Sequence, residues 1–284
     1  MLRLWVLSLA GRCQMTATFR EMREKAQNHP HLAADPLYGR LVMRRLSPYL
    51  TWLTVRYTSL SADAVTMIAI ASGVAAAIVL LFSSTLPYLA AVLLLQFSYL
   101  CDTFDGEVAR VRGTASKRGT YLDLVGHVIQ NRALFATSGV VFARTTDYSW
   151  WALAIVLLGL SFAAPFGYQS RLTVVGNSAA ALQAPSDGET NPHARPGSLR
   201  WPVAVNFGDR VWWLYRRLSF IWAYPALMNS YCVALIADAV RFAAGADEPI
   251  ILPAFTALFL VTLALKQVGN AVNLLRSDFW RGVV

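Results

Sequence analysis

The sequence predicts an all-α integral membrane protein, in which six transmembrane helices follow an amphipathic juxtamembrane helix. Of its 284 residues, 56% are hydrophobic and only 14% are charged, a balance that ordinary soluble domains do not have. The mean hydropathy is +0.44, and the apolar residues gather in long runs. The net charge of +9 does not indicate a nucleic acid partner, because basic loops beside an anionic lipid bilayer explain it.

Two segments precede the expected spans. Residues 1–35 form a polar N-terminal segment, and residues 36–60 are expected to form an amphipathic helix that lies along the membrane surface. Leu and Val residues recur at helical spacing from Leu37 to Leu53, while arginines fall on other faces. Pro48 is expected to bend or interrupt this helix. Packing of the helix against the transmembrane bundle is an alternative that the pattern also allows.

The remaining residues, 61–284, are expected to form a six-helix transmembrane domain. Since a span needs about 20 residues, the shorter apolar runs must extend into flanking polar sequence. Pro, Gly, Ser and Asn residues predict a long cytoplasmic loop at residues 176–210. The six apolar runs are Ala64–Phe82, Leu86–Leu100, Leu122–Ala143, Trp150–Phe166, Leu218–Ala237 and Ile250–Leu265.

The distribution of positive charge predicts the orientation of these spans. If the N-terminus is cytoplasmic, all lysines and arginines except Arg132, Arg144 and Arg241 fall in cytoplasmic segments. Cytoplasmic loops of membrane proteins carry such an excess of positive charge. We therefore expect the N-terminus, the active site and the C-terminus to face the cytoplasm.

Four side chains around the second and third runs are candidate metal ligands. Asp102 and Asp105 are three residues apart, and Asp123 and His127 are four apart, so each pair shares one face of a helix. If the two helices pack antiparallel, the four groups converge. Converging carboxylates repel one another unless a cation holds them, and oxygen ligands of this kind suit Mg²⁺ or Mn²⁺. The alternative is that the aspartates pair with basic side chains at the membrane interface.

The residues around these aspartates suit a phosphate-containing ligand. Gly106 leaves the helix surface open where a nucleotide could approach, and Ala109 continues that small surface. Positive charge for phosphate groups is available from Arg110, Arg112, Lys117 and Arg118.

The stretch from Asp102 to His127, written D-x2-D-G-x2-A-R-x8-G-x3-D-x3-H, resembles the signature of the CDP-alcohol phosphotransferase family. The family pattern is D-x2-D-G-x2-A-R-x8-G-x3-D-x3-D, so every position matches at the correct spacing except the last, where His127 replaces an aspartate. The expected spans and the preceding amphipathic segment look like this family as well. The resemblance covers residues 36–275.

The resemblance implies an integral membrane enzyme of phospholipid biosynthesis, commonly a homodimer. Such enzymes move a phosphoalcohol group from a CDP-linked donor to the hydroxyl group of an acceptor and release CMP. By this resemblance, Asp102, Asp105 and Asp123 hold divalent metal ions, which we expect to be two Mg²⁺ or Mn²⁺ ions.

The resemblance also assigns residues to the nucleotide. Those expected to bind the cytidine diphosphate group are Gly106, Ala109, Arg110, Ser116 and Gly119, with Ser116 in the place of a loop hydroxyl that helps to bind phosphate. The stretch "SADAVT", residues 61–66, looks like a degenerate form of the family's T-P-N-x-x-T entrance to the first span. Asp63 stands there in place of asparagine and is a further candidate for nucleotide binding.

His127 leaves three roles open. As a general base it would accept the proton of the acceptor hydroxyl, because an imidazole can take up a proton near neutral pH. As a nitrogen ligand it would shift the metal preference toward Mn²⁺ or Zn²⁺. The third alternative is a site that binds metal and nucleotide but catalyses poorly, which would make the protein a nucleotide- or lipid-binding membrane protein.

The donor and the acceptor stay open at this point. CDP-diacylglycerol and a CDP-polyol are both candidate donors, since "TVRYTSLSADAVT" resembles family members that use a soluble CDP-polyol to make inositol phosphodiesters. Arg132, inside the third expected span, could recognise an anionic acceptor such as a polyol phosphate. Alternatively, Arg132 extends to the membrane interface, or pairs with Asp147 or a helix carbonyl group.

Overall fold

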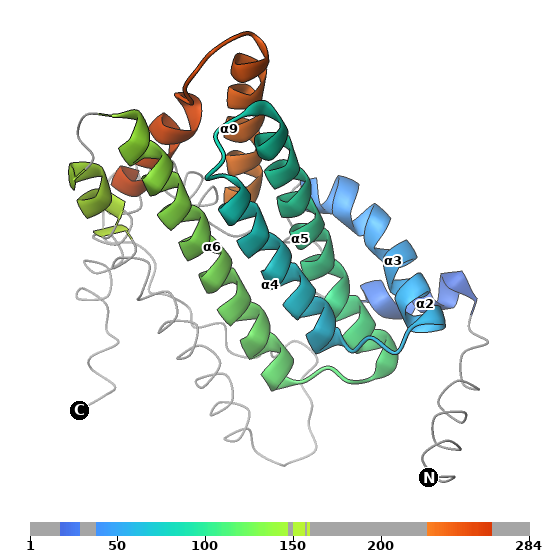
Figure 1. Ribbon diagram of the computed structural model, residues 1–284. Coiled ribbons are helices and arrows are strands. Elements are labelled where there is room, and N and C mark those ends of the chain that lie inside the picture. The colour runs from blue at the N-terminus through green and yellow to red at the C-terminus, as the bar shows by residue number, and fades with distance from the viewer. Residues whose placement is uncertain (1–17, 29–37, 147–149, 157, 160–225, 263–284) are drawn as a thin grey trace, which may run out of the picture. The chain divides into compact units, whose positions relative to one another are not determined.

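The computed structural model describes residues 18–28, 38–146, 150–156, 158–159 and 226–262 (Figure 1). Every regular element in these residues is a helix, as the sequence predicts. The elements are α2 (Phe19–Gln27), η2 (Gly39–Met43), α3 (Arg44–Tyr57), α4 (Ala62–Val79), α5 (Thr85–Arg112), α6 (Lys117–Thr145), α9 (Ala226–Ala243) and a helix at Ile251–Thr262. Residues 150–156 and 158–159 are helical as well. Helix α2 lies inside the segment for which the sequence predicts only polar character.

Two of the described helices, α4 and α5, are long and apolar enough to cross a membrane. Helix α6 covers the third expected span, and the helix Ile251–Thr262 covers most of the sixth. Residues 157 and 160–166 of the fourth span, the first part of the fifth and the expected loop at 176–210 lie outside the described residues. The structure therefore gives two candidate spans and supports a membrane protein, while six spans remain a prediction.

The described residues belong to two compact units, each with its own apolar core. The first consists of Met1–Gly73 and Gln96–Gly126, and the second of Val74–Leu95 and His127–Val284. The core of the first unit is formed by Val55, Val65, Ala69, Cys101, Phe104 and Val108. The core of the second unit is built around Leu80, Leu95, Leu134, Tyr231, Leu235 and Leu252.

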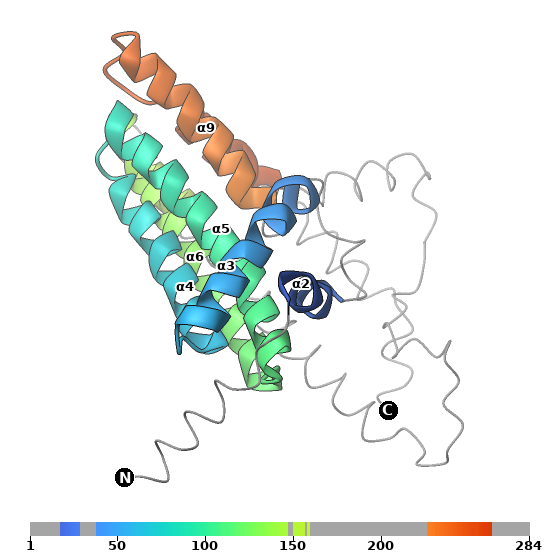
Figure 2. The ribbon, with the colours of Figure 1, turned by 90° about the vertical axis from the view of Figure 1, so that its right-hand side faces the viewer.

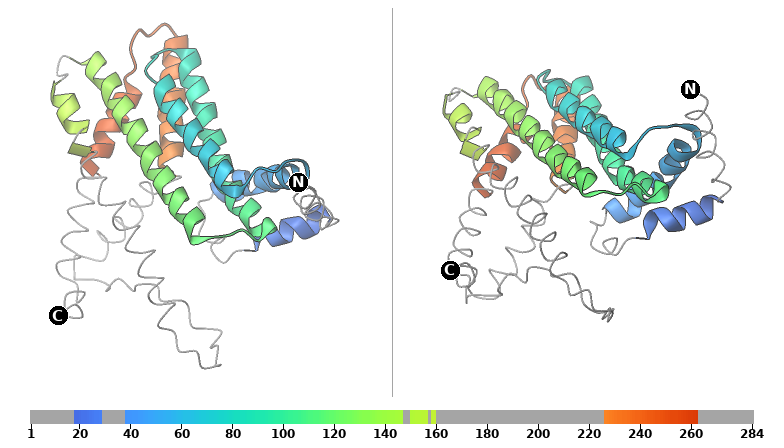
Figure 3. Two further views of the ribbon diagram at one scale, coloured as in Figure 1. Left: turned by 60° about the horizontal axis from the view of Figure 1, so that its bottom comes forward. Right: turned by 90° about the horizontal axis from the view of Figure 1, so that it is seen from below.

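Helices α5 and α6 are joined by a short turn with a cap at each end (Figure 3). Helix α5 continues past Leu100 and ends at Arg112. Gly113 follows with a φ of 68°, a backbone conformation that favours glycine and ends the helix. The N–H of Thr114 donates to Ala109 O (2.9 Å) and that of Gly113 to Arg110 O (3.3 Å), which is a Schellman C-cap. Helix α6 then begins at once, since the Ser116 hydroxyl accepts the N–H of Gly119 at 3.1 Å.

Pro48 does not interrupt the juxtamembrane helix, which continues to Tyr57 after the π-helical turn η2. Proline lacks the N–H that would bond to Arg44 O four residues earlier. The side chain of Gln27, at the end of α2, donates to this carbonyl instead, at 2.7 Å. The missing bond is thus replaced by a contact from another helix, which explains why the helix can continue.

Helix α3 has one face against its unit and one exposed apolar face. Ser47 and Thr51 are fully buried, whereas Leu46, Tyr49 and Leu53 are about half exposed (48%, 59% and 46%). This division supports both expected roles of the segment, packing on the helical unit and contact with a membrane surface.

Glu107 connects α5 to the buried face of α3. Its carboxylate is fully buried and accepts hydrogen bonds from Ser47 Oγ (2.7 Å) and Thr51 Oγ1 (2.8 Å). Arg44 Nη1 lies 3.3 Å from Glu107 Oε1 and completes an ion pair. A buried carboxylate with a full set of partners fixes the two helices in one register.

We expect Glu107→Ala to destabilise the protein by about 3 kcal/mol, because it leaves two buried hydroxyl groups and a partly buried arginine without their acceptor. Thermal unfolding in detergent, followed by circular dichroism, measures this change. The control is Glu24→Ala, which removes an exposed ion pair with Arg20 (3.2 Å) and should change stability by less than about 0.5 kcal/mol. Equal unfolding midpoints for the two variants would contradict a stabilising role of Glu107.

Candidate active site

Three of the predicted metal ligands converge. Possible ligand atoms of Asp102, on α5, and of Asp123 and His127, on α6, all lie within 4.8 Å of one another, and all three residues are half-buried. Asp123 and His127 are one turn apart on the same helix, so their common direction follows from helix geometry. The short α5–α6 turn provides the antiparallel arrangement that the spacing of the motif predicts.

Asp105, the fourth predicted ligand, is buried beside this cluster and held by α4. The hydroxyl of Thr66 donates to its Oδ2, and the N–H of Gly106 contacts its Oδ1. Asp105 lies three residues after Asp102 on α5, so both carboxyl groups are on neighbouring positions of one helix face. The side chain of Asp105 is therefore fixed in orientation by a neighbouring helix.

The start of α4 lies beside the start of α6. A Cβ placed on Gly119 would stand 3.7 Å from Asp63 Oδ1 and 3.5 Å from Ser116 Oγ. Arg118 Nε lies 3.8 Å from Asp63 Oδ2 in an exposed ion pair. The structure thus gathers Asp63, Ser116 and Gly119, which the sequence assigns to nucleotide binding from two distant stretches. Ser116 has in addition the structural task of capping α6.

Gly106 and Arg110 are adjacent on one face of α5. A Cβ on Gly106 would stand 3.2 Å from Arg110 Nη1, so the guanidinium group lies over the glycine. Ala109 is on the same helix, and its carbonyl oxygen takes part in the cap of α5. A Cβ at position 106 would require the Arg110 guanidinium group to shift by a few tenths of an ångström.

Arg112, which the sequence suggests as a phosphate ligand, contacts the backbone instead. Its guanidinium donates to Thr58 O at 2.9 Å, to Thr54 O at 3.3 Å and to Leu60 O. These carbonyl groups belong to the end of α3 and to the link into α4, and Thr54 O also accepts the N–H of Thr58 at 3.1 Å. Arg112 therefore caps the end of α3. The positive charge of the residue alone does not predict this role.

Two further residues belong to the site region although the motif assigns them no role. Thr66 ends the stretch "SADAVT", and the family motif ends in the same residue type. This match could have indicated a role for Thr66, and in the structure its hydroxyl group donates to Asp105. Glu107 lies between Gly106 and Val108. Its role could be anticipated from the sequence, since a carboxylate on a helix expected to enter a membrane requires a partner.

Farther along α6, two polar atoms are buried without a hydrogen-bond partner among the described residues. They are Asn131 Oδ1 and Arg132 Nε. Asp147, the acidic partner considered for Arg132, lies outside the described residues.

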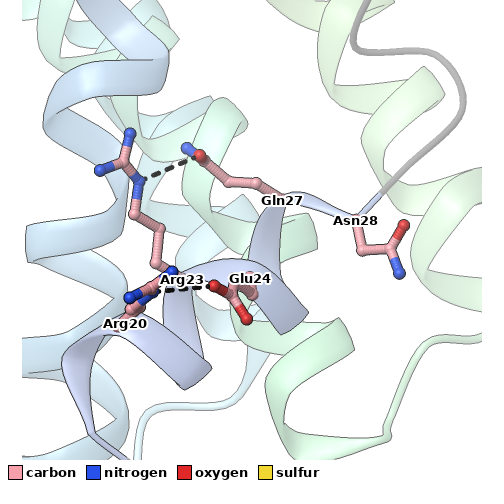
Figure 4. A pocket seen from close by; sticks show the side chains of 5 residues that line it. All are labelled: Arg20, Arg23, Glu24, Gln27 and Asn28. Atoms are coloured by element: carbon pink, nitrogen blue, oxygen red, sulfur yellow. Dashed lines mark hydrogen bonds and ion pairs between the residues drawn. The ribbon is translucent and has the colours of Figure 1, made fainter.

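A hollow on α2 is separate from the site. Figure 4 shows its lining residues, which are Arg20, Arg23, Glu24, Gln27 and Asn28. Within it, Arg20 pairs with Glu24 (3.2 Å) and Arg23 Nε donates to Gln27 Oε1 (3.4 Å), each one turn apart. None of the motif residues lines it, and its side chains form an ion pair and a hydrogen bond with one another.

The cluster fits a divalent cation by the chemistry of its donors. Two carboxylates from different helices and one imidazole direct possible ligand atoms to one place. Carboxylate oxygens suit Mg²⁺ and Mn²⁺, and the imidazole nitrogen adds a donor that favours Mn²⁺ or Zn²⁺. Asp105 stands next to this set with its orientation already fixed by Thr66.

Residues 59–183 match the model of the CDP-alcohol phosphatidyltransferase family. The match confirms the resemblance carried by the motif over these residues, and the matched family is one of transferases. Residues 36–58 and 184–275 of the expected resemblance lie outside the match. No curated protein matches the chain in a sequence search.

We expect Asp123→Asn to weaken Mn²⁺ binding by at least about tenfold, since even partners outside the ligand set of a metal site can cost that much. Electron paramagnetic resonance of free Mn²⁺ in the presence of the detergent-solubilised protein measures the affinity. Glu24→Gln, which neutralises an exposed carboxylate on α2, should leave the affinity unchanged. Equal affinity of Asp123→Asn and the unaltered protein would exclude Asp123 from a metal site.

Proposed function

We propose that the protein is a membrane-embedded phosphotransferase that moves a phosphoalcohol group from a CDP-linked donor to an acceptor hydroxyl group and releases CMP. The observation that carries this proposal is the convergence of Asp102, Asp123 and His127 within 4.8 Å, on the two helices that hold the family motif. The family match over residues 59–183 supports the reaction type. The positive charge of the expected cytoplasmic segments supports a site that faces the cytoplasm.

Divalent metal is part of the proposal. Asp102, Asp105 and Asp123 would hold it, and His127 would act as the general base. A bound dication would offset negative charge on the pyrophosphate and make the phosphorus more electrophilic. Thr66 keeps Asp105 in one orientation through its hydroxyl hydrogen bond, so the carboxylate does not have to be ordered when substrate arrives.

The chain's own residues perform the remaining steps. Arg110, lying over Gly106, would hold the diphosphate of the donor, and Asp63, Ser116 and Gly119 would lie along the nucleotide. His127 would accept the proton of the acceptor hydroxyl as its oxygen bonds to phosphorus. The anhydride bond to CMP breaks, CMP leaves, and the proton stays on His127 until it passes to solvent.

The acceptor is proposed to be anionic. Arg132 lies inside α6, and its Nε is buried with no hydrogen-bond partner among the described residues. A cation inside a membrane span is costly unless an anion or dipole pairs with it, and such residues commonly mark ligand sites. A phosphorylated polyol would supply both the hydroxyl group that reacts and the negative charge that Arg132 recognises. CDP-diacylglycerol and a CDP-polyol both suit the donor side, and a homodimer is proposed from the family resemblance.

The first test is CMP release by the detergent-solubilised protein with CDP-diacylglycerol or a CDP-polyol, Mg²⁺ or Mn²⁺, and a pool of alcohols and phosphorylated polyols. We expect His127→Ala to lower kcat by roughly 10²–10⁴-fold, the usual contribution of a general base. His127→Asp restores the family residue and should retain more activity than His127→Ala. If no metal supports CMP release while CDP still binds, the protein is a nucleotide-binding membrane protein.

We expect Arg132→Gln to raise the KM for a phosphorylated acceptor by about 10–100-fold, because a charge-assisted hydrogen bond is lost. The KM for the CDP-linked donor should not change. The matched control is Arg144→Gln, another arginine of α6, whose Nη1 donates to Leu81 O at 3.1 Å and which should leave both constants unaltered. An unchanged KM for the acceptor in Arg132→Gln, or activity with neutral alcohols alone, would refute an anionic acceptor.

A further inference from the structure

Helix α2 ends against the C-terminal part of α5, where the motif arginine lies. Arg110 Nε donates to the carbonyl oxygen of Ala26 at 2.7 Å, and Lys25 Nζ donates to Val111 O at 2.9 Å. The two helices are thus joined by reciprocal contacts, a side chain of each reaching the backbone of the other. Figure 2 shows α2 beside this end of α5.

The position of α2 is determined by more than these two hydrogen bonds. A capping box formed by Thr18 and Glu21 starts the helix, and Met22 and Ala26 are buried on its inner side (5% and 0% exposed). Phe19 stacks on Tyr49 of α3 with ring centroids 5.1 Å apart. Together with the bond from Gln27 to Arg44 O, these contacts hold both ends of a nine-residue helix.

The bond to Ala26 determines the orientation of the Arg110 guanidinium group. This group is planar, so a hydrogen bond at Nε limits rotation of the plane that carries both Nη groups. With Nε on Ala26 O, Nη1 stands 3.2 Å from the Cβ position of Gly106. The carbonyl end of α2 also carries partial negative charge, which favours a cation at this place.

We propose that α2 is a positioning element of the nucleotide site, in which the carbonyl group of Ala26 orients Arg110 toward the diphosphate of the CDP-linked donor. This inference rests on the proposed function for the identity of the ligand. It extends the site to residues 19–27, which lie outside the stretch matched by the family model. Arg110 would touch the ligand, whereas α2 acts through Arg110.

The test is a double-mutant cycle between α2 and Arg110, with CDP binding measured by calorimetry on the full-length, detergent-solubilised protein. Ala26→Leu places a larger side chain at a fully buried position and should move α2 away from α5. We expect it to weaken CDP binding about tenfold, as Arg110→Gln should by loss of a charged donor. The double variant should bind no more weakly than Arg110→Gln alone, because both changes remove the same interaction.

Controls separate positioning from general damage. Glu24→Ala, on the exposed side of α2, should leave CDP binding unchanged, and Ala26→Leu should keep the Mn²⁺ affinity of the unaltered protein, which shows that the α5–α6 region is intact. Lys25→Met removes only the contact with Val111 O and should weaken CDP binding less than Ala26→Leu. Where CMP release is measurable, Ala26→Leu should raise the KM for the donor and not that for the acceptor.

The outcomes distinguish this inference from the proposed function. Additive effects of Ala26→Leu and Arg110→Gln on CDP binding would overturn the positioning role, even in an active enzyme. Unaltered CDP binding by Ala26→Leu would overturn it as well. An absence of CMP release with intact CDP binding would refute the proposed reaction, while the cycle would still decide the role of α2.

Discussion

Carboxylate groups in apolar surroundings must be hydrogen-bonded or paired, and the described structure is organised around this requirement. Glu107 is enclosed by hydroxyl groups and an arginine, and Asp105 receives a hydroxyl from α4. Asp238 accepts the N–H groups of Ile250, Ile251 and Leu252 and thereby caps the helix that follows α9. Each of these acidic side chains therefore joins two elements, and its hydrogen bonds offset its cost of burial.

Helix α5 carries two of these three acidic side chains, Asp105 and Glu107. One face carries Asp102 and Arg110, which belong to the candidate site, and another carries Glu107, which binds α3. Because Gly106 and Glu107 are neighbours in the chain, α3 contacts α5 next to the glycine that lies under Arg110. The juxtamembrane helix is thus mechanically connected to the candidate site without contributing a ligand to it.

The candidate site could be predicted from the sequence to the extent that it depends on spacing along single helices. Asp123 and His127 share a face through helix geometry alone, and the apolar runs around them fix which helices meet. The long-range contacts could not be predicted in this way. The capping box of Thr18 and Glu21 and the spacing of Met22 and Ala26 mark α2 in the sequence, but its docking depends on hydrogen bonds to carbonyl groups, which the sequence does not reveal. For the same reason, the sequence does not reveal that Arg112 donates to distant backbone carbonyl groups. It also does not reveal that the helix continues through Pro48 because a side chain of α2 donates to Arg44 O.

The short turn between α5 and α6 has a consequence for the order of assembly. The candidate ligands all lie in the stretch from Asp102 to His127, and both helix ends at the turn are closed by local caps. Contacts between residues so close in sequence form early, because little chain entropy is lost in closing them. The acidic cluster can therefore come together as a helical hairpin during synthesis, before the C-terminal half of the chain has left the ribosome. A cation captured at that stage would act on folding as well as on chemistry.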